Sequence, residues 1–156
     1  MSVEFDTMEW RAQRDVRLME WLGDPHAVSF VQIVGECSEF FDDLIDKDKP
    51  ISDAWIYGML YKLMIDMHEN PFFTHYKTSL IPVMSTSINA WIDANALEKG
   101  TDENKNRAFV LRDLTVEVLL RTIELVRGRE YLRAVSLPVR EFFLHETLDE
   151  YKDKLP

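Results

Sequence analysis

Cysteine, glycine and proline are scarce in this chain of 156 residues. It has one cysteine, Cys37, with five glycines and six prolines. A single thiol cannot form a disulfide within the chain, so nothing in the cysteine content indicates a secreted, disulfide-stapled scaffold. The few glycines and prolines interrupt helical patterns and form no low-complexity tract or linker. The sequence therefore depends on apolar packing for its stability.

Basic charge and long apolar runs are also lacking. The chain has 18 Lys and Arg against 28 Asp and Glu, a formal net charge of -10 and a pI of about 4.8. Proteins that bind nucleic acid or anionic membranes use clustered Lys and Arg, so neither partner is expected. No apolar run approaches the roughly 20 residues that span a bilayer. The opening segment MSVEFDTMEW lacks the basic and apolar regions of a signal peptide, so we expect a cytoplasmic protein.

Apolar residues, in contrast, are abundant. They make up 46% of the chain, and aromatic residues make up 12%, which excludes a disordered acidic tail. The length is that of one typical domain. No alternation of apolar and polar residues is long enough to form a sheet. The sequence predicts an all-α fold, a single-domain bundle of five to six helices over residues 1–156.

Start and stop signals divide the chain into helices. The strongest is Asp24-Pro25, because an Asp N-cap followed by Pro at the first helical position starts a helix. The expected segments are a helix from Asp6 or Thr7 to Gly23, one over 26–45, one from Ser52 or Asp53 to Glu69, a short piece over 72–77, one that starts or kinks at Pro82 and ends at Gly100, one from Thr101 to Gly128, a short turn near Tyr131, and a last helix from Pro138 to about Tyr151.

Two of the expected helices are apolar on nearly all sides. They cover 53–69 and 101–128. A helix that is apolar on all sides must be covered on all sides, and a bundle of this size cannot easily cover two of them. We therefore expect the protein to associate with itself. Aromatic side chains are the usual anchors of such contacts, which makes Trp55, Tyr57 and Tyr61 the candidate interface.

The same argument gives a set of residues expected to be buried, either within the chain or against another copy. They come from the two most apolar helices and are Trp55, Leu60, Leu63, Met64, Leu114, Val118 and Leu119.

Acidic residues form a stripe on the helix expected over 26–45. Glu36, Glu39, Asp43 and Asp46 lie opposite the apolar face of this helix, with Asp42 and Asp48 nearby, and several of them sit near its C-terminus. The helix dipole disfavours negative charge at that end. The stripe is either a solvated face or a site for a cation or a basic partner, and the sequence leaves both interpretations open.

No pattern typical of a nucleophile, a phosphate-binding loop or a cofactor site occurs in the chain. Cys37 falls on the apolar face of its helix, where a free cysteine behaves as a small hydrophobic residue. We assign no catalytic, cofactor-binding or metal-binding residue from these patterns.

The segment VGECSEF resembles the metal-binding helix of the MazG-type nucleoside triphosphate pyrophosphohydrolases, an all-α family. In that family, a Val-Gly-Glu-x-x-Glu-like run and a Glu-x-x-Asp pair on a second helix supply carboxylates for Mg²⁺. Residues 34–36 with Glu39 match the first part, and Asp66 with Glu69 is an inexact match to the second. The resemblance implies Glu36, Glu39, Asp66 and Glu69 as candidate Mg²⁺ ligands.

This local resemblance is incomplete. The family usually has two acidic residues before the Val-Gly pair, where this chain has Gln32 and Ile33. The position of Glu36 and Glu39 opposite the apolar face also argues against ligands that point into a bundle. The alternative it implies is a divergent enzyme that lacks part of its catalytic acids.

Longer strings resemble a group of small helical proteins encoded by tailed bacteriophages. These strings are FFDDLIDKDKPIS, NPFF, SINAWIDANALE and AFVLRD, and the resemblance covers residues of about 24–150. The group has no assigned activity, so the resemblance implies a viral origin and adds no catalytic residue.

Together, these observations predict a non-enzymatic α-helical interaction protein without a cofactor. The resemblance implies a phage accessory, virion or host-interaction protein, located in the cytoplasm of the infected bacterium or in the virion. Its expected partner is a protein, in the first place a second copy of itself. The alternative is the divergent Mg²⁺-dependent pyrophosphohydrolase.

Overall fold

The computed structural model describes residues 8–47 and 49–155. No β-strand occurs among them, and the continuous helical runs cover 8–22, 25–46, 53–69, 71–97, 102–143 and 148–154. This confirms the all-α class and the expected five to six helices. Contacts within the chain divide it into two compact units, Met1–His75 and Tyr76–Pro156, and the boundary falls near the start of the fourth run.

The first unit begins with α1 (Met8–Leu22) and α2 (Pro25–Asp46), which pack against each other. The predicted cap between them is confirmed, because the Asp24 carboxylate accepts hydrogen bonds from the backbone N–H groups of His26 and Ala27 at 2.8 and 3.1 Å. Gly23 ends α1 in a left-handed conformation with φ of 65°. The predicted helix start at Asp6 or Thr7 lies outside the described residues.

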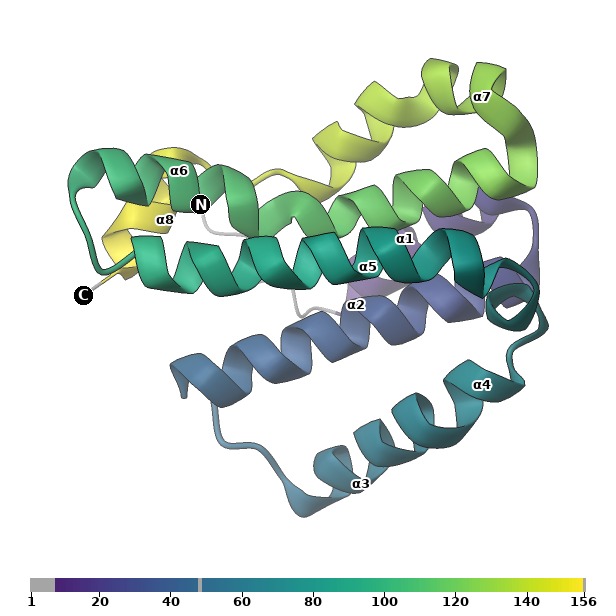
Figure 1. Ribbon diagram of the computed structural model, residues 1–156, viewed down its shortest axis with the longest axis horizontal. Coiled ribbons are helices and arrows are strands. Elements are labelled where there is room, and N and C mark those ends of the chain that lie inside the picture. Colours follow the sequence, from purple (N-terminus) through teal and green to yellow (C-terminus); the bar gives the residue numbers. More distant parts are fainter. Residues whose placement is uncertain (1–7, 48, 156) are drawn as a thin grey trace. The chain divides into compact units, whose positions relative to one another are not determined.

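The third run consists of α3 (Asp53–Tyr61), a π-helical turn (Lys62–Asp66) and α4 (Met67–Glu69). It starts as predicted, since the Ser52 hydroxyl accepts a hydrogen bond from Trp55 N at 3.2 Å. Within the first unit, α3 and α4 run back along α2 (Figure 1). We call residues 53–69 the α3–α4 helix.

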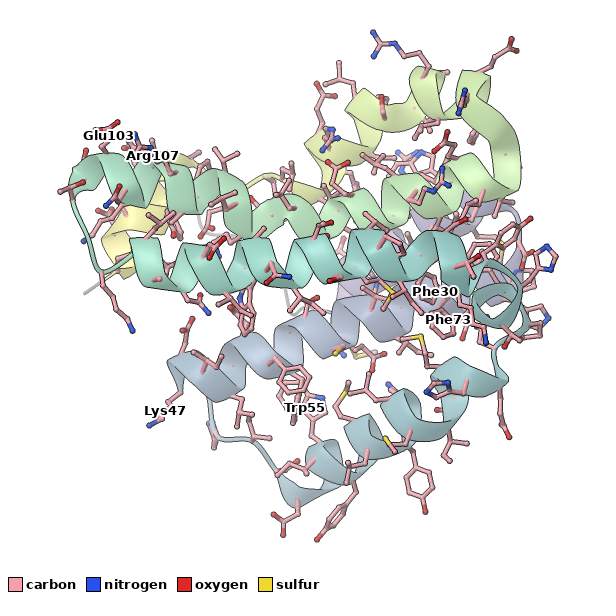
Figure 2. The ribbon with its side chains drawn as sticks, in the orientation of Figure 1. Phe30, Lys47, Trp55, Phe73, Glu103 and Arg107 are labelled. Atoms are coloured by element: carbon pink, nitrogen blue, oxygen red, sulfur yellow. The ribbon has the colours of Figure 1, made fainter. Side chains whose placement is uncertain are left out.

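Buried aromatic rings hold the first unit together. Phe30 of α2 is fully buried, and its ring centroid lies 5.7 Å from that of Phe72 and 5.6 Å from that of Phe73. Figure 2 shows Phe30 and Phe73 side by side. Asn70 fixes the junction between residues 69 and 71, where one helical run ends and the next begins. Its side-chain amide donates a hydrogen bond to His26 O at 2.9 Å and accepts one from Phe73 N at 3.0 Å. The ring cluster and this buried amide thus join the first turns of α2 to the C-terminal end of the unit.

Helix α5 spans Pro71–Leu97 without a break, so the predicted division of this region was wrong. We expected a short piece over 72–77 and a new helix or a kink at Pro82, whereas the helix is continuous through Pro82. Proline in a helix interior removes one backbone hydrogen bond. One turn further along, the Thr86 hydroxyl donates to Pro82 O at 3.2 Å and to Val83 O at 3.0 Å. These side-chain hydrogen bonds link the proline to the turn that follows it.

The second unit continues with α6 (Asp102–Arg112), a 3₁₀ turn (Asp113–Thr115) and α7 (Val116–Phe143). Thr101 caps α6 as predicted, through a 3.3 Å hydrogen bond from Asn104 N. The prediction of one uninterrupted α-helix over 101–128 was wrong, because the 3₁₀ turn separates α6 from α7. Ser87 of α5 donates to Leu114 O in this turn at 3.1 Å.

Helix α7 reverses direction at Gly128, which has φ of 84° and ψ of 172° (Figure 1). The predicted helix end at Gly128 is therefore correct. The short turn near Tyr131 and the helix start at Pro138 are wrong, since the returning half is helical through both residues and ends at Phe143. The last element, α8 (Leu148–Lys154), starts with a capping box formed by Thr147 and Glu150.

The expected core residues fall into three groups. Val118 and Leu119 are buried in α7, where Val116, Leu120 and Ile123 are buried too. Trp55, Leu63 and Leu114 are half-buried. Leu60 and Met64 are exposed, so their burial within the chain was wrong and only burial against another molecule is left for them. Within the described ranges, no helix combines the length and apolarity needed to cross a membrane.

Candidate functional site

The α3–α4 helix has an inner face that packs within the first unit. Along it lie Trp55, Met59, Leu63 and Met67, at intervals of four residues, and the two methionines are buried. In an ordinary α-helix, a spacing of four drifts sideways by about 40° at every step. The π turn widens the helix by one residue, with Met67 N donating to Lys62 O, and so returns Met67 to the inner side.

The outer face of the same helix is apolar and exposed. Tyr57, Leu60, Tyr61 and Met64 follow the i, i+3, i+4, i+7 spacing of one helix face, and they are 60%, 55%, 68% and 67% exposed. Ile56 and Ile65 flank them. Single exposed apolar residues are normal on protein surfaces, whereas a contiguous apolar face is a candidate for an interaction site. We call Tyr57, Leu60, Tyr61 and Met64 the outer face.

The structure brings together two of the three predicted interface residues. Tyr57 and Tyr61 lie on the outer face, whereas Trp55 points from α3 toward α2 (Figure 2). The Trp55 ring meets Phe40 edge-on, with centroids 5.3 Å apart and planes at 80°. Leu60 and Met64, which were expected to be buried within the chain or against another copy, lie on the same exposed face as these two tyrosines. Their spacing relative to Tyr57 and Tyr61 is the signal that identifies the face.

The acidic stripe of α2 lies on the side that α3 covers. Glu36 forms an ion pair with Lys62 of the π turn, and Glu36, Glu39 and Asp43 are all half-buried. Their side chains line a groove of about 470 Å³. The lining residues are Arg11, Glu36, Glu39, Asp43, Lys49, Trp55 and Lys62. The stripe was expected opposite the apolar face of α2, but it shares its side with the buried Phe40, which contacts Trp55, so that side is packed rather than solvated. Asp48 lies outside the described residues.

The candidate Mg²⁺ ligands do not form a cluster. Glu36 is neutralised by Lys62, and Asp66 and Glu69 are exposed. Among the described residues, no group of three or more His, Cys, Asp or Glu side chains is placed to hold a metal ion. The Cys37 thiol is half-buried, and burial raises its pKa, which disfavours the nucleophilic thiolate.

A second group of polar side chains, in the second unit, fastens α8. The Glu98 carboxylate accepts hydrogen bonds from Arg112 and from the Tyr151 hydroxyl, both at 2.5 Å. The Arg112 guanidinium also lies 5.4 Å from the centre of the Tyr151 ring. Beside it is an apolar cluster of Ala94, Ala108 and Tyr151. Each of these polar groups is satisfied by another member, so the arrangement ties α8 to the residues around Glu98 and Arg112.

Asp113, in the 3₁₀ turn, has an unusual carboxyl group. Burial raises its pKa from 3.8 to about 6; Arg112 and His145 lower the pKa, whereas Glu146 raises it. The folded chain therefore holds this proton more tightly than the unfolded chain does. Stability contributed by the protonated group is fully present below about pH 4 and is lost as the pH rises through about 6.

Asp113→Asn is expected to stabilise the protein at pH 7.5 by roughly 1–2 kcal/mol, because it removes a poorly solvated charge. The ordinary and raised pKa values differ by roughly 3 kcal/mol in free energy, and solvent screening reduces this figure. Urea unfolding at pH 7.5 and pH 4 measures the effect, which should disappear at the lower pH. Asp93→Asn, at an exposed position of α5, is the control and should change little at either pH. An Asp113→Asn gain that persists at pH 4 would contradict this account.

No family model matches the chain, and neither the curated proteins nor the solved structures contain a significant match to it.

Proposed function

We propose that this is a non-enzymatic α-helical interaction protein that associates with itself through the outer face of the α3–α4 helix. The observation that carries the proposal is the exposure of Tyr57, Leu60, Tyr61 and Met64 at the spacing of one helix face. Tyrosine and methionine are enriched at interfaces, where they give large contact area. In the acidic stripe of α2, in contrast, Glu36 already forms an ion pair with Lys62 of the same chain.

The charge of the first unit shapes this association. Residues 1–75 contain 6 Lys and Arg against 15 Asp and Glu, a net charge of -9, whereas residues 76–156 contain 12 against 13, a net charge of -1. Two copies that meet through α3 must therefore bring together the two strongly negative halves. Salt screens this repulsion and strengthens the apolar contact.

Sedimentation at micromolar concentration tests the proposal. We expect a monomer–dimer mixture that shifts toward dimer between about 0.02 M and about 0.5 M NaCl, because the Debye length falls severalfold over this range. The double variant Tyr57→Ser, Tyr61→Ser should be monomeric under both conditions. The matched control Val110→Ser, Leu137→Ser removes two equally exposed apolar residues from the second unit and should still dimerise. A wild-type chain that stays monomeric at both salt concentrations would refute the proposal.

The biological setting that we propose is a bacteriophage infection, with the protein acting as an accessory, virion or host-interaction component. The support is the resemblance of the strings between about residues 24 and 150 to small phage proteins. In that setting the protein resides in the cytoplasm of the infected bacterium or in the particle. Quantifying the protein in purified virions and in the infected-cell lysate distinguishes a particle component from one that acts only in the cell. Absence from both would remove this setting.

The alternative, a divergent Mg²⁺-dependent nucleotide pyrophosphohydrolase, has weaker support. Its only structural argument is that Glu36 and Glu39 line one groove with Asp43. A thermal-shift series with Mg²⁺, run with an assay for pyrophosphate release from nucleoside triphosphates, tests it. Stabilisation by Mg²⁺ together with pyrophosphate release would replace our first proposal by this one.

A further inference from the structure

We propose that two copies pair their α3–α4 helices in an antiparallel arrangement, around a twofold axis that passes beside Leu60 and Tyr61. This inference rests on the proposed self-association and specifies its geometry. Closed dimers of identical chains are usually symmetric, so the same patch must complement itself. The outer face has its centre between residues 60 and 61, and it has an apolar residue at each step to either side.

The antiparallel arrangement places unlike side chains opposite each other away from the axis. Tyr57 lies at the height of the partner's Met64, which gives the contact between a thioether and an aromatic ring that is favourable in proteins. At the axis, Tyr61 lies beside the partner's Tyr61 and Leu60 beside the partner's Leu60. The four large apolar side chains that are most exposed on this helix are thereby covered by one symmetric contact.

Charge at the ends of the helix favours the antiparallel arrangement over the parallel one. Asp53 and His68 are both exposed, and they lie four residues beyond Tyr57 and Met64 on the same stripe. Antiparallel pairing places Asp53 beside the partner's His68, an imidazole that can donate a hydrogen bond to the carboxylate. Parallel pairing places Asp53 beside the partner's Asp53 and aligns the two helix dipoles unfavourably. Lys62, the only Lys or Arg of this helix, is held by Glu36.

The size of the contact sets its strength. The α3–α4 helix is about 25 Å long, and one helix from each copy buries less than the roughly 1,200 Å² of total surface at which standard interfaces begin. The pairing therefore belongs to the weak, reversible class, with dissociation in the micromolar range.

Disulfide cross-linking in a Cys37→Ser background tests the arrangement. Tyr61→Cys should form a covalent dimer under mild oxidation, because residue 61 lies next to its own copy at the axis. Tyr57→Cys alone should form about tenfold less covalent dimer, because residue 57 of one copy is too far from residue 57 of the other for a disulfide. In a mixture of the two variants, Tyr57→Cys chains should cross-link to Met64→Cys chains. Asp53→Cys mixed with His68→Cys tests the same register from the rim and leaves the outer face intact. Val110→Cys is the exposed control.

The outcomes separate this inference from the proposed function. Sedimentation of the reduced Asp53→Cys and His68→Cys chains reports association independently of the cross-links. Dimers that cross-link through Tyr57→Cys alone would establish parallel pairing and overturn the inference while leaving self-association in place. Dimers in which none of the introduced thiols cross-links would place the contact on another surface. Chains that do not associate at all would refute the proposed function as well.

Discussion

Phe30→Ala is expected to lower the free energy of unfolding by about 3–5 kcal/mol, the largest effect that we predict for a single substitution. Phe30 is fully buried between Phe72 and Phe73, and both ring pairs lie within the distance range of favourable aromatic contacts. The substitution removes the transfer free energy of the ring and leaves a cavity that the rigid neighbours cannot fill. Urea unfolding followed by circular dichroism measures the loss.

Phe41→Ala is the matched control for this prediction. Phe41 is on the same helix but is exposed, so its truncation should cost less than about 1 kcal/mol. Equal effects of the two substitutions would mean that the ring cluster is not the core of the first unit.

The same unfolding curves bear on domain organisation. The sequence predicts one domain, and contacts divide the chain into two compact units. If the two units unfold as one domain, Phe30→Ala should shift a single transition. A wild-type-like second transition in this variant would instead show that residues 76–156 unfold on their own.

Glu98→Ala is expected to destabilise the protein by about 2–4 kcal/mol, since it leaves Arg112 and the Tyr151 hydroxyl without their shared acceptor. The side chains of Glu98 and Arg112 are only 12% and 20% exposed, so water replaces the lost contacts poorly. Glu98→Gln keeps an acceptor for the hydroxyl and should cost less. Urea unfolding gives the free energies.

The matched control uses the exposed ion pair of α6. Glu103 and Arg107, labelled in Figure 2, are 2.5 Å apart, as Glu98 and Arg112 are, but both are mostly exposed. Glu103→Ala should cost about 0.5 kcal/mol or less. A comparable loss from Glu98→Ala would mean that the Glu98 cluster contributes no more than a surface pair.

Most helix boundaries could be predicted because they depend on local chemistry. Asp24, Ser52 and Thr101 cap helices as expected, and Gly128 adopts a positive φ where the apolar pattern stops. Each of these signals acts within one turn of the chain. The boundaries misplaced at Pro82 and Pro138 had another cause, since whether packing outweighs the missing hydrogen bond of a proline is not a local property.

The candidate site was predicted only in part for a related reason. Periodicity indicates which side chains share a face of a helix, but it does not show which element covers that face. Glu36 and Glu39 were placed opposite the apolar stripe of α2, yet α3 packs on their side. Trp55 was grouped with Tyr57 and Tyr61 by composition, whereas a difference of two residues turns it to the other side of the helix.

The π turn in the α3–α4 helix also determines how this region tolerates changes of length. Deleting one residue from 62–66 would leave a regular α-helix, so helical content would not reveal the loss. Because five residues of a π turn sweep about the same angle as four residues of an α-helix, everything beyond the deletion would keep its orientation about the helix axis. Met67 would stay on the inner face and the Asn70 amide would stay aligned with His26 O, whereas inserting one more residue would rotate both by about 100°. In related sequences, this segment should therefore accept the loss of one residue far more readily than the gain of one.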